Sequence, residues 1–182
     1  MADFKTLLAA EFAPLGSLSD SQLQLLRLHF ELLLRWNRRI NLSRITSLLE
    51  AVRFHYCESL YLAQSLPKQP LSVVDIGSGA GLPGIPVAVM RPECSIDLVE
   101  SHQRKAVFLI EVVRKLELPN VRVLAKRAEN IVGAYDWMIS RAVPAEDILK
   151  LNLAANAAVL GSVGDKLPWG EARALLRVER LA

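Results

Sequence analysis

Hydrophobic positions in the first third of the chain recur at the three- and four-residue spacing of a helix. Ser19 and Gln22 have the spacing of a capping box, so we expect a helix to begin after Ser19 and to extend to about Trp36. Its apolar face consists of Leu23, Leu26, Phe30, Leu33 and Leu34.

A second capping box predicts another helix. Ser47 and Glu50 have the same spacing, and the helix is expected to reach about Ser65. Pro67 and Pro70 then end it and form a short linker. Residues 1–66 are therefore predicted to form a helical layer.

After the linker the pattern changes to short apolar runs. One helical stretch, 104–116, lies between them. The predicted strands are 71–76, 95–100, 121–125 and 136–140. Strands that alternate with helices predict an α/β fold with a parallel sheet covered on both faces. We expect residues 67–182 to form this domain and to pack with the helical layer as one unit.

The last part of the chain has a weaker pattern. Residues 148–156 are predicted as helix and 157–163 as strand, while 173–181 fit a strand or a helix.

Composition narrows the class of protein. The chain has 182 residues and a formal net charge of +3, which permits a nucleic-acid partner without requiring one. The N-terminus does not have the pattern of a signal peptide, and no apolar run approaches the roughly 18 residues of a membrane span. Cys57 and Cys94 form no CxxC pair, which argues against a zinc site and favours a reducing cytoplasm.

The strongest chemical signal follows the first predicted strand. Asp75 ends that strand, and Gly77, Gly79 and Gly81 follow it before the next helix. Glycines at such a turn allow the backbone to turn tightly and to approach a ligand. An acidic residue two positions before them suits a cationic ligand, namely the amino group and sulfonium of S-adenosylmethionine, better than a pyrophosphate.

Two other interpretations of this segment remain open. Gly79, Gly81 and Gly84 satisfy GxGxxG, which by itself is a weak indication of a nicotinamide-dependent oxidoreductase. The other alternative is a glycine-rich turn that binds no ligand. Glu100 ends the next strand, 23 positions after Gly77, where a carboxylate can accept both hydroxyls of an adenosine ribose. Since both cofactors carry that ribose, Glu100 does not separate them, and an ordinary surface acid is its alternative.

Beyond this loop, the sequence resembles the RsmG (GidB) family of bacterial small-subunit rRNA guanine-N7 methyltransferases. The resemblance extends from about Trp36 to Val143 and consists of five segments in order. These are Trp36-Asn37 with Asn41-Leu42; His55 with Glu58-Ser59; Asp75 to Pro86; Glu100-Ser101 with Arg104-Lys105 and Phe108-Leu109; and Arg127-Ala128-Glu129 followed by Ile139-Ser140-Arg141-Ala142.

The resemblance implies a Rossmann-like class I methyltransferase with a mostly parallel seven-stranded sheet behind an N-terminal helical extension. It implies methyl transfer from S-adenosylmethionine to N7 of a guanine in 16S rRNA, with rRNA or the small ribosomal subunit as partner, in the cytoplasm. It places Gly77 and Leu82 at the cofactor, Ala128 and Glu129 beside the adenine, and Arg141 near the reacting methyl group. A cofactor-binding module without turnover is the alternative, and a monomer is expected.

The chain also departs from the family pattern. Position 58 is Glu where the family usually has Asp, and Phe54 stands where a basic residue is usual. After Val143 the resemblance fades.

Basic residues are grouped around Trp36 and near the expected cofactor edge. They are Arg35, Arg38, Arg39, Arg44, Arg104 and Lys105. They are interpreted as phosphate contacts for RNA or as a solvated helix end.

N7 of guanine carries a lone pair and no proton, so its methylation needs positioning rather than a general base. His55 and Glu58 are expected to pair on one helix face, with a structural role for His55 favoured over substrate contact. Arg141 is assigned to the reacting end, where its fork of donors suits a carboxylate, O6 of guanine or a phosphate. A tie between the strand end and the helical layer is the alternative role of Arg141.

Overall fold

The computed structural model describes residues 3–45 and 47–179. Its helices are α1 (Phe4–Phe12), α2 (Asp20–Asn37), α3 (Leu48–Ala51), the π-helical turn η1 (Val52–Cys57), α4 (Glu58–Ser65), α5 (Gly84–Met90), α6 (Gln103–Lys115), the 3₁₀ turn η2 (Ala128–Asn130) and α7 (Ala145–Lys150). Its strands are β1 (Ser72–Ile76), β2 (Ser95–Val99), β3 (Val121–Leu124), β4 (Tyr135–Arg141), β5 (Ala154–Gly161), β6 (Asp165–Leu167) and β7 (Gly170–Val178).

These strands form one seven-stranded sheet in the order β3-β2-β1-β4-β5-β7-β6. The first five strands are parallel, whereas β7 runs antiparallel to both β5 and β6. The strand order changes direction between β1 and β4, and ligands of open parallel sheets bind at such a point, beyond the carboxyl ends of the strands. The predicted fold class, including the number of strands, is confirmed.

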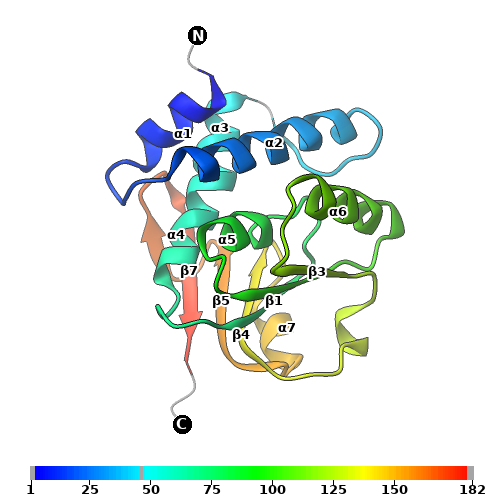
Figure 1. Cartoon of the computed structure of the whole chain (residues 1–182). Coiled ribbons are helices and arrows are strands. Elements are labelled where there is room, and N and C mark those ends of the chain that lie inside the picture. The colour runs from blue at the N-terminus through cyan, green and yellow to red at the C-terminus, as the bar shows by residue number, and fades with distance from the viewer. Residues whose placement is uncertain (1–2, 46, 180–182) are drawn as a thin grey trace.

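The two faces of the sheet are covered unequally (Figure 1). On one face α5 and α6 lie against the sheet and the N-terminal helices pack over them, so one buried cluster contains residues from Phe4 to Leu175. The other face has a smaller cluster to which α7 contributes Ile148. Helices before residue 66 and strands after it therefore share one core. The division at residue 66 itself stays a prediction.

The predicted start of α2 is confirmed in detail. The Ser19 hydroxyl accepts from the Gln22 amide, and the Gln22 side chain accepts from the Ser19 amide, which is a complete capping box. At the second predicted box only half of the arrangement forms: the Ser47 hydroxyl accepts from the Glu50 amide, and among the described residues no return bond from the Ser47 amide to the Glu50 side chain is found. The helix expected from there to Ser65 is interrupted by the π-helical turn η1.

The C-terminal predictions needed correction. The helix predicted over 148–156 is wrong, because α7 ends at Lys150 and β5 already begins at Ala154. Asn152 lies between them with φ 53°, a left-handed conformation that cannot continue a helix. The strand alternative for 173–181 is confirmed by β7, although residues 180 and 181 lie outside the described part. The short strand β6 was not predicted.

Among the described residues, no helix is both long and apolar enough to span a membrane. Both cysteines are buried free thiols, as expected, and the described residues contain no cluster of side chains suited to a metal ion.

Candidate cofactor and substrate site

The glycine-rich loop leaves β1 at its carboxyl end and turns toward α5. Gly77, Gly79 and Gly81 have φ values of 69°, 52° and 79°, in the left-handed region that other residues rarely adopt. The Ser78 amide donates to the Val99 carbonyl at 3.0 Å, which ties the loop to the end of β2. The sequence of strand, glycine loop and helix is as predicted.

The four glycines of the loop serve two different purposes. A Cβ atom on Gly81 would lie 2.7 Å from Ile85, and one on Gly84 would lie 2.3 Å from Leu98, so these two glycines allow close packing. A Cβ on Gly79 would meet only the Gly77 carbonyl, at 3.7 Å, and both residues line a pocket. Gly77 and Gly79 thus line the pocket, and a Cβ on Gly77 would lie 3.2 Å from Val143, whereas Gly81, predicted as a cofactor contact, faces the helices.

Asp75 lies behind the loop. It is fully buried, and one carboxylate oxygen accepts from the Gly84 amide at 3.1 Å while the other has no hydrogen-bond partner among the described residues. Burial raises the pKa of Asp75 to about 7, opposed by the nearby Ser78 hydroxyl and by the hydrogen bond from the Gly84 amide, and aided by the charge of Glu100. Asp75 does not line the pocket beside Gly77 and Gly79, so its carboxylate lies behind the glycine loop and does not face that pocket.

Glu100 follows β2 directly and is nearly buried. Its carboxylate accepts from the Gly79 amide at 2.9 Å and from the His102 amide at 2.7 Å. It therefore fixes the loop against the start of α6. A carboxylate has about four lone-pair positions, so two acceptor positions remain for a ligand.

The pocket beside Gly77 and Gly79 has a volume of about 270 Å³. The sheet side contributes the loop and the end of β4, and the N-terminal layer contributes the opposite wall. The lining residues are Leu42, Ser43, Arg44, His55, Gly77, Ser78, Gly79, Ala80, Leu82, Lys105, Arg141 and Ala142. We call this the loop pocket. It brings together six predicted site residues, which are Arg44, Gly77, Gly79, Leu82, Lys105 and Arg141.

Arg141 enters the pocket from a buried charge cluster. The carboxylate of fully buried Glu58 binds the Arg173 guanidinium through both oxygens, and Arg141 Nη1 lies 3.5 Å from the same carboxylate. Arg141 Nη1 makes no hydrogen bond within the described residues. Burial lowers the pKa of Arg141 to about 10, so it stays cationic at neutral pH. Two guanidinium groups share one carboxylate, which leaves one positive charge for an anion.

The expected pairing of His55 with Glu58 is wrong, because the Arg173 and Arg141 side chains take the Glu58 carboxylate. Burial, together with the charges of Arg141 and Arg173, lowers the pKa of His55 to about 3. His55 is therefore neutral at working pH.

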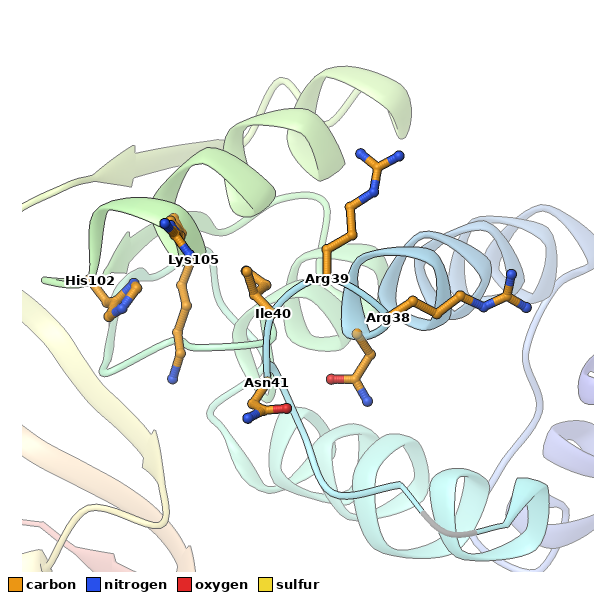
Figure 2. Close-up of a pocket in the computed structure, with 8 residues that line it drawn as sticks. Arg38, Arg39, Ile40, Asn41, His102 and Lys105 are labelled. Carbon is orange, nitrogen blue, oxygen red and sulfur yellow. The ribbon is translucent and has the colours of Figure 1, made fainter.

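The basic residues predicted to bind RNA form an exposed rim beside the loop pocket. A second depression of about 420 Å³ lies between the end of α2 and the start of α6. It is lined by Asn37, Arg38, Arg39, Ile40, Asn41, His102, Arg104 and Lys105. In Figure 2, Lys105 extends from α6 toward Asn41, whereas the guanidinium groups of Arg38 and Arg39 point outward. Arg35 and Arg44 are exposed as well.

The remaining predicted contacts lie farther along the same edge of the sheet. Ala128 and Glu129 begin η2 after β3, with Ala128 partly buried and Glu129 exposed, and neither lines the loop pocket. Trp137 and Phe108 are buried in the core, as expected, and so offer no surface for stacking with a base.

One contact to the loop was not predicted. The ring of buried His29, on α2, bonds through Nε2 to the Ala80 carbonyl at 2.9 Å and through Nδ1 to the Tyr56 hydroxyl at 2.8 Å. The helical layer is thereby attached to the glycine loop. Nothing in the local pattern around His29 distinguishes it from an ordinary helix residue.

Comparison with known proteins agrees with this geometry. A family model described as "rRNA small subunit methyltransferase G" (GidB) matches residues 22–156. Among curated proteins, the ribosomal RNA small subunit methyltransferase G of Roseiflexus sp. strain RS-1 is 40% identical over 157 residues, covering 80% of this chain and 67% of that protein. The protein of the same name from Lactococcus lactis subsp. lactis strain IL1403 is 36% identical over 140 residues, covering 72% of this chain and 59% of that protein.

A similar fold occurs in a solved structure. A SAM-dependent methyltransferase from Aquifex aeolicus has a TM-score of 0.51 and 17% identity, covering 66% of this chain and 71% of that one. The likeness at this identity concerns the fold alone.

Proposed function

This chain belongs to the rRNA small subunit methyltransferase G (GidB) family, and we propose that it transfers a methyl group from S-adenosylmethionine to N7 of a guanine in 16S rRNA. The matched segments span about half to two thirds of the length of the curated relatives named above and of a third from Roseiflexus castenholzii. The proposal therefore rests on what these residues can do, together with the family. Its partner is small-subunit rRNA or the assembled subunit, in the cytoplasm.

The residues of the site fit the cofactor. Gly77 and Gly79 line the loop pocket in left-handed conformations, and Glu100, which holds the Gly79 amide, is proposed to accept the ribose hydroxyls with its remaining lone pairs. Arg141 provides an uncompensated cation for the methionine carboxylate or for an RNA phosphate. Ala128 and Glu129 are proposed to lie beside the adenine, since they follow the neighbouring strand β3. Asp75 and Gly81 shape the loop from behind.

The chemistry demands little proton transfer from the protein. When bound, S-adenosylmethionine supplies a sulfonium methyl group that the N7 lone pair can attack without loss of a proton. Arg141 stays protonated and His55 stays neutral, so neither residue is suited to serve as a base near neutral pH. Their role is to position and to set the local charge.

One observation supports the proposal: the loop pocket joins Gly77 and Gly79, the uncompensated Arg141, Arg44 of the helical layer and Lys105 of α6. The proposed cofactor loop therefore lies beside the basic residues proposed to bind RNA. The nicotinamide interpretation needs no such rim, and the family membership argues against it.

The test is to incubate the protein with labelled S-adenosylmethionine and small ribosomal subunits that lack the modification. We expect label at one guanine, located by chemical cleavage specific for N7-methylguanine. Titration calorimetry should also detect S-adenosylhomocysteine and not NAD. Cofactor binding without any labelled base identifies a binding module without turnover, and binding of NAD alone contradicts the proposal.

A further inference from the structure

A further cavity, distinct from the depression between α2 and α6, lies next to the loop pocket at the same edge of the sheet. It has a volume of about 490 Å³ and is formed where β4 and β5 end. Its lining residues are Ala142, Val143, Pro144, Ala145, Glu146, Val159, Leu160, Gly161, Ser162, Val163 and Leu176. Ala142 lines both cavities, so whatever occupies this one lies beside the loop pocket.

The backbone at the junction is strained. Ala142 has φ 62°, a left-handed conformation that is unfavourable for a residue with a Cβ atom. Its amide still donates to the Leu160 carbonyl at 3.4 Å, so β4 keeps its contact with β5 through the turn. Strain of this kind persists where the surrounding structure imposes it, and it is concentrated at ligand sites.

The walls of the cavity are almost entirely apolar. Val163 is 68% exposed although it is a large aliphatic residue in the turn after β5. Among the described lining residues Glu146 carries the only charge. A planar ring with one hydrogen-bonding edge fits such walls, whereas a phosphate or a sugar chain would find one repelling carboxylate and no cation.

We propose that this cavity, the apolar pocket, receives the unstacked target guanine, with Val143, Pro144 and Val163 against its faces and Glu146 accepting from its N1–H and N2 amino group. The proposal deepens the proposed function and rests on it. A guanine whose N7 faces the loop pocket turns its N1 and N2 edge away from that pocket. Of the four bases, guanine alone presents two adjacent donors on that edge.

Glu146 also has an electrostatic effect on the reaction. Methylation at N7 places a positive charge on the purine, which strengthens the hydrogen bonds that N1–H and the N2 amino group donate. A carboxylate at that edge therefore binds the transition state more tightly than the neutral base. Its loss is expected to lower kcat as well as raise KM for RNA.

The experiment compares guanosine with inosine, which lacks the N2 amino group, placed only at the mapped target position of ligated small-subunit rRNA. Wild type is expected to lose roughly tenfold or more in kcat/KM on inosine, the effect of one charged hydrogen bond. Glu146→Ala is expected to lose roughly 10- to 100-fold on guanosine and to discriminate less than threefold between the two bases. S-adenosylhomocysteine affinity is expected to be unchanged.

Asp147→Ala is the matched control, because Asp147 is the neighbouring acid on α7 and pairs with Lys150 rather than lining the cavity. It is expected to behave as wild type. The assignment of the target guanine to the apolar pocket is refuted if Glu146→Ala keeps the wild-type preference for guanosine over inosine. Absence of methyl transfer by wild type would instead refute the proposed function itself, so the two failures are distinguishable.

A second pair of variants tests the wall without touching the carboxylate. Val163→Asp adds a charge at an exposed position, so the fold tolerates it, and turnover is expected to fall at least tenfold with an unchanged melting temperature. Val132→Asp makes the same change at a valine that is 98% exposed and outside the cavity, and it is expected to be silent. Equal activity of the two variants contradicts the assignment.

Discussion

Two groups of charged residues at the site, here called the floor and the rim, differ in their exposure to solvent. The floor, defined as Glu58, Asp75, Glu100 and Arg141, is buried or nearly so, and each group contacts a specific protein partner, although Asp75 Oδ1 and Arg141 Nη1 make no hydrogen bond among the described residues. The rim, defined as Arg35, Arg38, Arg39, Arg44, Arg104 and Lys105, is mostly exposed. Apart from Glu58, which was expected only to pair with His55, the residues of both groups were predicted from sequence to contact the cofactor or RNA.

The difference follows from the dielectric surroundings. A buried charge is costly unless it is paired, and removing its partner leaves that cost uncompensated. An exposed charge interacts through water and ions, so its contribution is diffuse and falls with salt. The floor should therefore respond to single substitutions by large changes that salt does not affect, and the rim by small, salt-dependent ones.

The largest effect is expected at Glu58. Glu58→Ala leaves Arg141 and Arg173 without their shared buried partner, which should lower the free energy of unfolding by about 3–5 kcal/mol. Urea denaturation of the variant and of wild type measures this change in the free energy of unfolding. Glu179→Ala, which removes the partner of Arg177 at the surface, is the control and should change stability little. Equal effects of the two variants would contradict the distinction between buried and exposed charge pairs.

At Arg141 the expected loss is in turnover rather than in stability. Arg141→Ala should lower kcat/KM by about 10²–10³-fold, because a preorganised cation is removed from the reacting end. The melting temperature should stay near wild type, since Glu58 keeps its bonds to Arg173. Arg141→Lys should restore little activity, because one ammonium cannot reproduce the fork. A fully active alanine variant would remove Arg141 from the site.

Glu100 should affect cofactor binding by about two orders of magnitude. Glu100→Ala removes the bond to the Gly79 amide and the proposed ribose contacts, and charged hydrogen bonds contribute roughly 1.5–3 kcal/mol each. Calorimetry with S-adenosylhomocysteine measures the change. A loss below about threefold would mean that the carboxylate makes no contact with the cofactor and that the loop does not depend on it.

Substitutions in the rim should change how strongly RNA binding depends on salt concentration. Reversal of Arg38 and Arg39 to Glu should weaken RNA binding and reduce the slope of its salt dependence by roughly 0.7–0.9 for each lost phosphate contact. Cofactor affinity should not change. Arg114→Glu with Lys115→Glu makes the same charge change at the far end of α6 and serves as the control. An unchanged slope in the Arg38 and Arg39 variant would identify a solvated face.

A pH dependence of stability is also expected, and it originates at Asp75. Its pKa is about 7 in the folded protein and about 4 when unfolded, so the folded state holds the extra proton between these values. Stability should accordingly decrease as pH rises from about 4 to 7, and should level off above that. Asp75→Asn should remove this slope in denaturation experiments at several pH values.

His55 should contribute no step to the rate between pH 6 and 8, because its pKa is about 3. A neutral-range step that survives in His55→Asn and disappears in Asp75→Asn would assign it to the loop. A step that requires His55 would contradict a mechanism without a general base.

Sequence reasoning succeeded where structure is local. The helix start at Ser19 is confirmed because a capping box lies within four residues, and β1 with its glycine loop is confirmed because strand, turn and helix are contiguous. It failed over 148–156, where apolar residues of β5 also fit a helix and only pairing with β4 selects the strand.

The sequence by itself determined that a strand ends in a glycine-rich turn beside an acid, and the family motifs around it. Only the tertiary structure decided which glycines line the loop pocket and which charges are buried. The reason is distance along the chain: Glu58 and Arg173 meet across 115 positions, and Arg141 joins them from a third element. Burial depends on such contacts between distant segments, and packing beside Glu58 is what holds the Arg141 guanidinium at the loop pocket.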